Sequence, residues 1–229
     1  MNIFSYESKF NQVVMTIADL IILNILYIVC CIPVFTISAA QAGLFTGIRV
    51  LLDKEDDRSV AKSFFQGFAD GFGKSAIAGT IVLILLAISL WFTTYAAVYY
   101  GAGSSILPLV LCIILAVAAY STHSILGPFH ATFGCTVWQL IRNSFFVLFA
   151  YPFRSLLVAL LTVLPLVVML VWPHILLGGI IAFIGLYYST AYLLCFSLLK
   201  KPFDRLKESF NAANSTEEDE EDEDDEEDK

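Results

Sequence analysis

Apolar segments of about 20 residues, nearly free of charged side chains, recur along this chain and leave few folds open to it. A helix of that length crosses the hydrocarbon core of a bilayer and satisfies its own backbone hydrogen bonds. We predict five such spans, at residues 16–37, 77–100, 106–126, 153–171 and 175–199. Because 58% of the residues are hydrophobic, against roughly 45–50% in soluble domains, we expect an all-α, polytopic membrane helix bundle.

Three further segments have the mixed polarity of helices that lie in the membrane interface, at residues 3–14, 60–74 and 130–150. With the spans they form a membrane domain over residues 1–208. Residues 209–229 are expected to be a disordered acidic tail, because Glu217 to Asp228 is an unbroken run of twelve mutually repelling charges. Residues 1–216 hold 12 basic and 9 acidic groups, so the net charge of −8 conceals a mildly basic membrane part.

The basic residues fall in alternate connections between the predicted spans, which gives an expected orientation. The turns between spans two and three and between spans four and five contain no Lys or Arg. By the positive-inside rule, the basic side faces the cytoplasm, so we expect the N-terminus outside and the acidic tail inside. The basic residues that fall together are Arg49, Lys54, Arg58, Lys62, Lys74, Arg142, Arg154, Lys200, Lys201, Arg205 and Lys207.

Small residues recur every four positions in two places, so each set lies on one helical face. The first small row is Ala39, Gly43 and Gly47. The second small row is Ser63, Gly67, Gly71, Ser75 and Gly79. Such faces let helix backbones approach closely, either within one chain or between a chain and a partner. Beside the second row, Phe64, Phe68 and Phe72 form an aromatic row that we expect at the membrane interface.

Polar side chains within apolar segments are the usual indicators of a site in a membrane protein. Asp19 and Asn24 lie in the first span, and Gln41 follows it. Two interpretations stay open: these groups contact a ligand or a partner helix, or they are hydrated or bonded to a neighbouring helix. They also argue against a cleaved signal peptide, so we expect the first span to be retained.

Three prolines are expected to bend or interrupt helices, since proline lacks a backbone donor and restricts the residue before it. Pro33 should bend the first span and free carbonyl groups that Thr36 or Ser38 can satisfy. Pro128, after Gly127, should interrupt the third span, and Pro152 should mark the bend before the fourth.

Neither a metal nor another cofactor is expected. His123, His130 and His174 are the only histidines, and no arrangement of them supplies the three or more convergent ligands of a typical site. The five cysteines lie in or beside apolar segments without a C-x-x-C pair, as small buried hydrophobes do. No acid–base or nucleophile–base pair is evident, so we do not expect an enzyme.

Three stretches form a distinctive pattern: Asn24-Ile25-Leu26-Tyr27, then Ile32-Pro33-Val34-Phe35-Thr36-Ile37-Ser38-Ala39-Ala40, then Ser63-Phe64-Phe65-Gln66-Gly67-Phe68. These residues carry a resemblance to the YesL-like family of bacterial membrane proteins, a family of unknown function. It covers roughly residues 1–200, although Ser38 replaces a frequent glycine and the acidic tail lies outside the pattern. The resemblance implies a bacterial cell-membrane protein connected with carbohydrate utilisation, often encoded beside sugar ABC transporters.

From the small rows and the resemblance we expect a non-enzymatic accessory membrane protein linked to carbohydrate uptake. Its expected partners are the lipid bilayer and either sugar ABC transporter permease subunits or a second copy of itself, and not nucleic acid. The alternative is a small-molecule carrier or channel in its own right, in which Asp19, Asn24 and Gln41 line a path.

Overall fold

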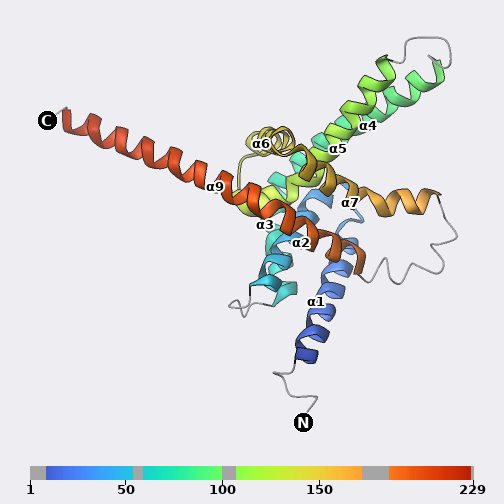
Figure 1. The fold of residues 1–229 in the computed structure, drawn as a ribbon, viewed down its shortest axis with the longest axis horizontal. Coiled ribbons are helices and arrows are strands. Elements are labelled where there is room, and N and C mark those ends of the chain that lie inside the picture. Colours follow the sequence, from blue (N-terminus) through green and yellow to red (C-terminus); the bar gives the residue numbers. More distant parts are fainter. Residues whose placement is uncertain (1–8, 54–58, 100–106, 172–185, 228–229) are drawn as a thin grey trace.

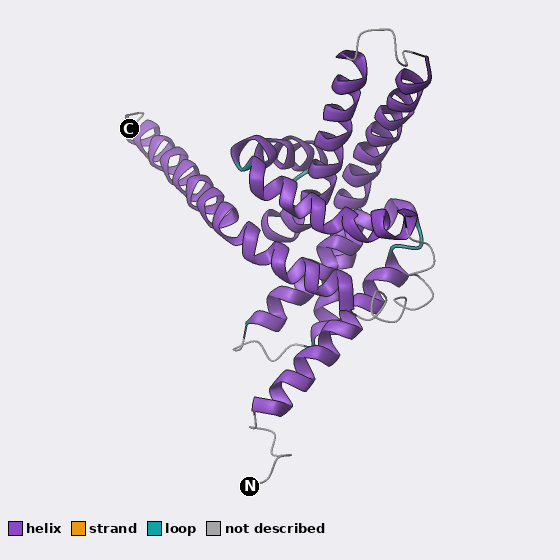
Figure 2. Cartoon of the chain, turned by 45° about the vertical axis from the view of Figure 1, so that its right-hand side comes forward, coloured by secondary structure: helices purple, strands orange, loops and turns teal. Residues whose placement is uncertain are grey.

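The computed structural model describes residues 9–53, 59–99, 107–171 and 186–227, and the regular elements in these ranges are all helical (Figures 1 and 2). This confirms the predicted all-α fold class. The elements are α1 (Lys9–Cys30), η1 (Val34–Thr36), α2 (Ile37–Leu52), α3 (Val60–Phe72), α4 (Lys74–Tyr99), α5 (Leu107–Phe133), α6 (Val137–Ala150), α7 (Pro152–Val171) and α9 (Tyr188–Glu227).

Helix α2 is the centre of the molecule. Eleven of its 16 residues are buried, and helices α1, α3, α4, α5 and α9 all pack against it. One apolar cluster joins Leu44 and Ile48 of α2 to Leu23 of α1 and Tyr192 of α9. A second joins Phe45 of α2 to α4, α5, α6, α7 and α9. The core is therefore built around a helix that we expected only as a continuation of the first span.

The chain breaks between α1 and α2 at Pro33. Helix α1 ends at Cys30, seven residues before the end of the predicted span, and the short helix η1 leads into α2. The Thr36 hydroxyl lies 2.5 Å from the Cys30 carbonyl oxygen and 2.6 Å from that of Pro33, and its hydrogen is shared between them. Thr36 thus satisfies the carbonyl groups that the break frees, whereas Ser38 has a different partner, described below.

Helices α4 and α5 pack against each other as a long hairpin that leaves the α2–α3 region in a different direction from α1 (Figure 1). The predicted interruption at Pro128 is wrong, because α5 continues through it to Phe133. Proline is tolerated inside a span when packing and neighbouring hydroxyls support the backbone. Here the Thr132 hydroxyl donates to the Pro128 carbonyl at 2.9 Å, and Gly127 packs on α2.

The turn to α6 comes later than expected, at Gly134, whose φ of +60° suits a residue without a side chain. Helix α6 therefore covers only Val137–Ala150 of the predicted helix 130–150. A capping box between Thr136 and Gln139 begins it. Pro152 is the first residue of α7, where a proline costs no hydrogen bond, and α6 and α7 meet there at 111°. The bend predicted at Pro152 is present.

Among the described residues, four helices are long and apolar enough to cross a membrane, or five if the bent pair α6–α7 is one span. They include Val13–Cys30, Lys74–Val98 and Leu107–Phe133, which correspond to the first three predicted spans. The additional one is Val34–Leu52, which contains α2 and is 67% buried. Residues 3–8 of the first interfacial helix and residues 175–185 of the fifth span lie outside the described residues. The chain is a multi-pass membrane protein.

The acidic segment extends α9 instead of starting a separate region. We expected disorder from residue 209, but the helix continues to Glu227 and projects from the bundle (Figure 1). Glutamate and alanine favour the helical backbone, which here prevails over the repulsion between neighbouring carboxylates.

Candidate functional site

The two small rows face each other across the α2–α3 hairpin. A Cβ atom added to Gly43 would lie 2.7 Å from the Phe64 carbonyl oxygen, and one added to Gly67 would lie 2.7 Å from Thr46 Cβ. One added to Gly71 would lie 3.2 Å from Ala42 Cβ. Contacts this short leave no room for a side chain, so the glycines permit the two helices to touch. The sequence left internal and external packing open, and in the structure these rows pack internally.

The aromatic row has two environments. Phe64 is fully buried between α1, α2 and α3, and its ring stacks on that of Phe68. Phe72 is 47% exposed and meets Phe35 edge to face. The row therefore runs from the protein core to the surface, and Phe64, buried in the core, does not lie at the membrane interface where we expected the whole row.

The last members of the second small row meet the start of α2 and the middle of α5. The hydroxyl groups of Ser38 and Ser75 lie 2.9 Å apart, and both side chains are buried. A Cβ atom on Gly79 would lie 2.4 Å from Ser38 Cβ and 3.5 Å from His123 Cε1. Helices α2, α4 and α5 therefore converge at a buried polar junction, which we define as Ser38, Gln41, Ser75 and His123.

Two side chains of this polar junction have buried atoms without a partner among the described residues, Gln41 Oε1 and His123 Nδ1. Gly127 of α5 makes the approach possible, because a Cβ there would lie 2.4 Å from Gln41 Cβ and 2.8 Å from the Ala42 nitrogen. The sequence analysis did not predict the polar junction. Gln41 was noted, but its place opposite Gly127, and that of His123 beside Gly79, depend on how three helices pack.

The three intramembrane polar residues are not brought together. Asn24 is fully buried and accepts a hydrogen bond at 3.2 Å from the Ser189 backbone N–H, while the Ser189 hydroxyl donates to the Leu20 carbonyl at 2.7 Å. Asn24 therefore fastens α9 to α1. Gln41 faces α5 instead, and Asp19 is partly exposed at the middle of α1. The path that the carrier alternative requires is not assembled from these residues.

Two arginines donate to carbonyl groups of other helices, Arg49 near the end of α5 and Arg154 within α9. Arg49 donates to the Ala131 carbonyl at 3.2 Å and to the Thr132 hydroxyl at 3.1 Å, near the C-terminus of α5. Arg154 donates to the Leu198 carbonyl at 3.3 Å. A cation at carbonyl groups near a helix end is favourable because of the helix dipole. The first contact brings Arg49, in the last turn of α2, close to the C-terminal end of α5.

The remaining histidine and thiol groups near this end form no catalytic arrangement. His130 Nε2 lies 3.2 Å from the Asp70 carbonyl oxygen, and the described residues contain no group of three His, Cys, Asp or Glu that could hold a metal ion. Burial raises the pKa of the Cys135 thiol, and the nearby Lys74 ammonium only opposes that shift. The thiol stays protonated at neutral pH and is not an activated nucleophile.

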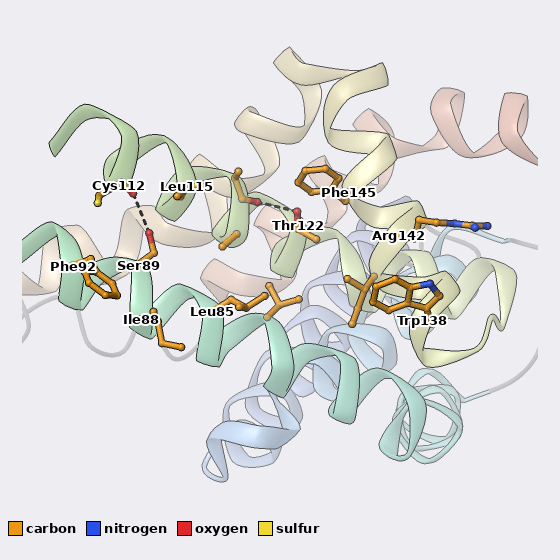
Figure 3. A pocket seen from close by; sticks show the side chains of 14 residues that line it. Leu85, Ile88, Ser89, Phe92, Cys112, Leu115, Thr122, Trp138, Arg142 and Phe145 are labelled. Atoms are coloured by element: carbon orange, nitrogen blue, oxygen red, sulfur yellow. Dashed lines mark hydrogen bonds between the residues drawn. The ribbon is translucent and has the colours of Figure 1, made fainter. Parts of the chain in front are cut away.

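An apolar groove of about 660 Å³ runs along the α4–α5 hairpin and is closed at one end by α6 (Figure 3). Helix α4 contributes one face through Val82, Leu85, Ser89 and Phe92, and α5 contributes Cys112, Leu115, Ala118 and Thr122. Trp138 and Arg142 of α6 stand at the closed end. Sequence reasoning did not find this groove, because each helix alone reads as an ordinary lipid-facing span.

No curated protein and no solved structure matches the chain. A family model described as a protein of unknown function, DUF624, matches residues 20–95, about a third of the chain. The matched region contains Asn24, Pro33 and both small rows, which are the residues that carried the resemblance. Over residues 20–95 the chain is thus similar to the DUF624 family of proteins of unknown function, the family that includes the YesL-like proteins.

Proposed function

We propose that the chain is a non-enzymatic accessory protein of the bacterial cell membrane, linked to carbohydrate uptake, that associates laterally with another membrane protein. Permease subunits of a sugar ABC transporter are the partners we favour, and a second copy of the chain is the other candidate. The link to carbohydrate uptake is supported by the resemblance to YesL-like proteins alone.

The observation that carries this proposal is the exposed side of α1. The described part of its span is only 17% buried. Val13, Ile17, Ile25 and Val29 are each more than 40% exposed, and the four-residue spacing within the pairs Val13–Ile17 and Ile25–Val29 puts the members of each pair on nearly the same side of α1. We call these four residues the α1 outer row. β-Branched side chains have few rotamers to lose, so a face of this kind can pack against a second helix at little entropic cost.

The structure changes which surface should meet the partner. The sequence suggested the small rows, but a Cβ atom added to any of their glycines would lie 2.4 to 3.2 Å from another part of the chain. Freeing them would separate α2 from α3 and expose the core. The α1 outer row is largely exposed among the described residues, so a partner can cover it without any rearrangement.

Photo-crosslinking in native membranes tests the proposal. A benzophenone amino acid placed at Val29 of the full chain should crosslink to a membrane protein, whereas the same probe at the fully buried Ala40 should not. Mass spectrometry then identifies the adduct. A sugar-transporter permease at Val29 would support the proposal. Recovery of the chain free of any transport component, with only lipid adducts at Val29, would overturn it.

The carrier alternative is favoured by one observation, the unpartnered Gln41 and His123 atoms in the polar junction. A polar group buried in a span without a partner is costly and is often part of a substrate path. Sugar flux into proteoliposomes that contain only this chain would establish the carrier function. Loss of that flux in Gln41→Leu would place the path at the junction.

A further inference from the structure

We propose that the groove between α4, α5 and α6 binds the acyl chain of an anionic phospholipid, whose phosphate pairs with Arg142. This inference is independent of the proposed partner, since it concerns a different surface and a ligand that the membrane itself supplies.

The walls of the groove accept hydrocarbon and little else. Its two hydroxyl groups are already engaged, because Ser89 donates to the Cys112 carbonyl at 3.0 Å and Thr122 to the Ala118 carbonyl at 2.9 Å. The remaining lining of α4 and α5 is aliphatic, aromatic or a thiol. A sugar in this groove would leave its hydroxyl groups without partners, at a cost for each one. An alkyl chain has no such groups and fits without penalty.

The length of the groove matches one leaflet. Its α4 wall runs from Val82 to Phe92, ten residues or about 15 Å of helix at 1.5 Å per residue. The hydrocarbon core of a bilayer is about 30 Å thick, so one leaflet is about 15 Å deep. A groove of this length along a predicted membrane hairpin is sized for a single acyl chain.

The chemistry changes at the closed end, where α6 crosses the hairpin. Arg142 lines the groove with its alkyl stem, and its guanidinium group extends past the end (Figure 3). The side chain is exposed and forms no ion pair with any residue that the structure describes. A guanidinium group can bind phosphate oxygens in a bidentate manner, and basic pockets between spans bind anionic head groups. Trp138, one helical turn away, has the amphipathic ring typical of the head-group level.

Arginine next to an apolar channel requires a ligand that is anionic at one end and apolar along the rest. An anionic phospholipid such as phosphatidylglycerol has that shape. Because Arg142 is one of the basic residues that we expect at the cytoplasmic side, the lipid should come from the inner leaflet.

Fluorescence quenching tests the site on the full chain. The chain has three tryptophans, and Trp91→Phe with Trp172→Phe leaves Trp138 as the reporter. The protein is reconstituted in phosphatidylcholine vesicles with a minor fraction of brominated phosphatidylglycerol or of brominated phosphatidylcholine. We expect the anionic lipid to occupy the groove about fivefold more readily, the preference that corresponds to the attraction of one basic residue near a membrane surface.

Substitutions test the contact with the lipid head group and the contact with its acyl chain separately. Arg142→Gln should abolish the head-group preference, while Lys207→Gln, which changes an exposed charge on α9, should not. Ala118→Phe should fill the groove and reduce quenching by both lipids, and Val117→Phe on the exposed side of the same turn should have no effect. If Ala118→Phe fails to fold, the comparison of the two brominated lipids in the protein without that substitution still tests the proposal.

Three results would overturn the proposal. They are equal quenching by the two lipids, an unchanged preference in Arg142→Gln, and relief of the phosphatidylglycerol quenching by inorganic phosphate. The last result would mean that the site binds the anion and not the lipid.

Discussion

At the scale of single residues, glycine determines how closely the helices of this chain approach. The sequence predicted the small rows from their four-residue spacing, and it could not say what they would touch, since spacing carries no information about the facing helix. Gly127 is the clearest example of a residue whose contact could not be predicted from the sequence. Next to Pro128 it reads as a helix breaker, yet its place in the structure is a contact with the backbone of α2.

Substitution of Gly43 by alanine should destabilise the protein. The added methyl group would lie 2.7 Å from the Phe64 carbonyl oxygen, which belongs to the backbone and cannot move without shifting α3. Overpacking of this kind costs about 1–3 kcal/mol, measurable as a fall in the unfolding temperature of the detergent-solubilised chain. Gly73→Ala is the matched control, because a Cβ there meets nothing within 4 Å. Equal stability of the two variants would contradict the contact.

At the scale of elements, local sequence signals predicted where most helices lie but not how they join. The pattern at residues 60–74 gave α3 almost as the structure has it, because its aromatic and small positions repeat regularly. The prolines gave mixed results. Pro33 and Pro152 stand where helices separate, whereas Pro128 lies inside α5, where Gly127 packs on α2 and the Thr132 hydroxyl donates to the Pro128 carbonyl. A rule about one residue cannot anticipate that support.

The antiparallel pairing of α2 and α3 predicts a specific disulfide. Ala42 Cβ lies 3.2 Å from the position of a Cβ on Gly71, close to the 3.5–4.5 Å that a disulfide needs. With the five native cysteines replaced, Ala42→Cys with Gly71→Cys should crosslink on mild oxidation and shift on a non-reducing gel. The pair Ala42→Cys with Gly73→Cys should stay reduced. Crosslinking in the second pair alone would mean that the register of the hairpin is different.

At the scale of the whole molecule, composition was enough to predict a multi-pass helical membrane protein, because no other fold satisfies so many apolar segments. The number of crossings could not be predicted in the same way. The region of α2 was predicted only to carry a small face, and the structure shows a helix that is long enough to span but mostly buried. The groove along the α4–α5 hairpin lay beyond prediction for a related reason, since it exists only where α4, α5 and α6 meet.

Reporter fusions test the expected orientation. The positive-inside rule predicts that a fluorescent protein at the C-terminus folds in the cytoplasm and fluoresces, and that alkaline phosphatase there is inactive. Phosphatase inserted between residues 100 and 106, in an uncharged connection, should be active. The opposite pattern at both positions would reverse the orientation. Activity at both would mean that the chain crosses the membrane an even number of times after residue 106, as it would if the bent pair α6–α7 does not cross.

The central place of α2 also determines when the protein can be completed. The ribosome makes α2 early, whereas α5 and α9, which cover two of its sides, are made later. Until α5 arrives, Ser38 and Gln41 lack the helix that encloses them, and polar groups are costly to expose to lipid. A chain whose synthesis stops before α5 therefore holds its second helix unprotected. During that interval the nascent protein is most accessible to the proteases that remove unassembled membrane proteins.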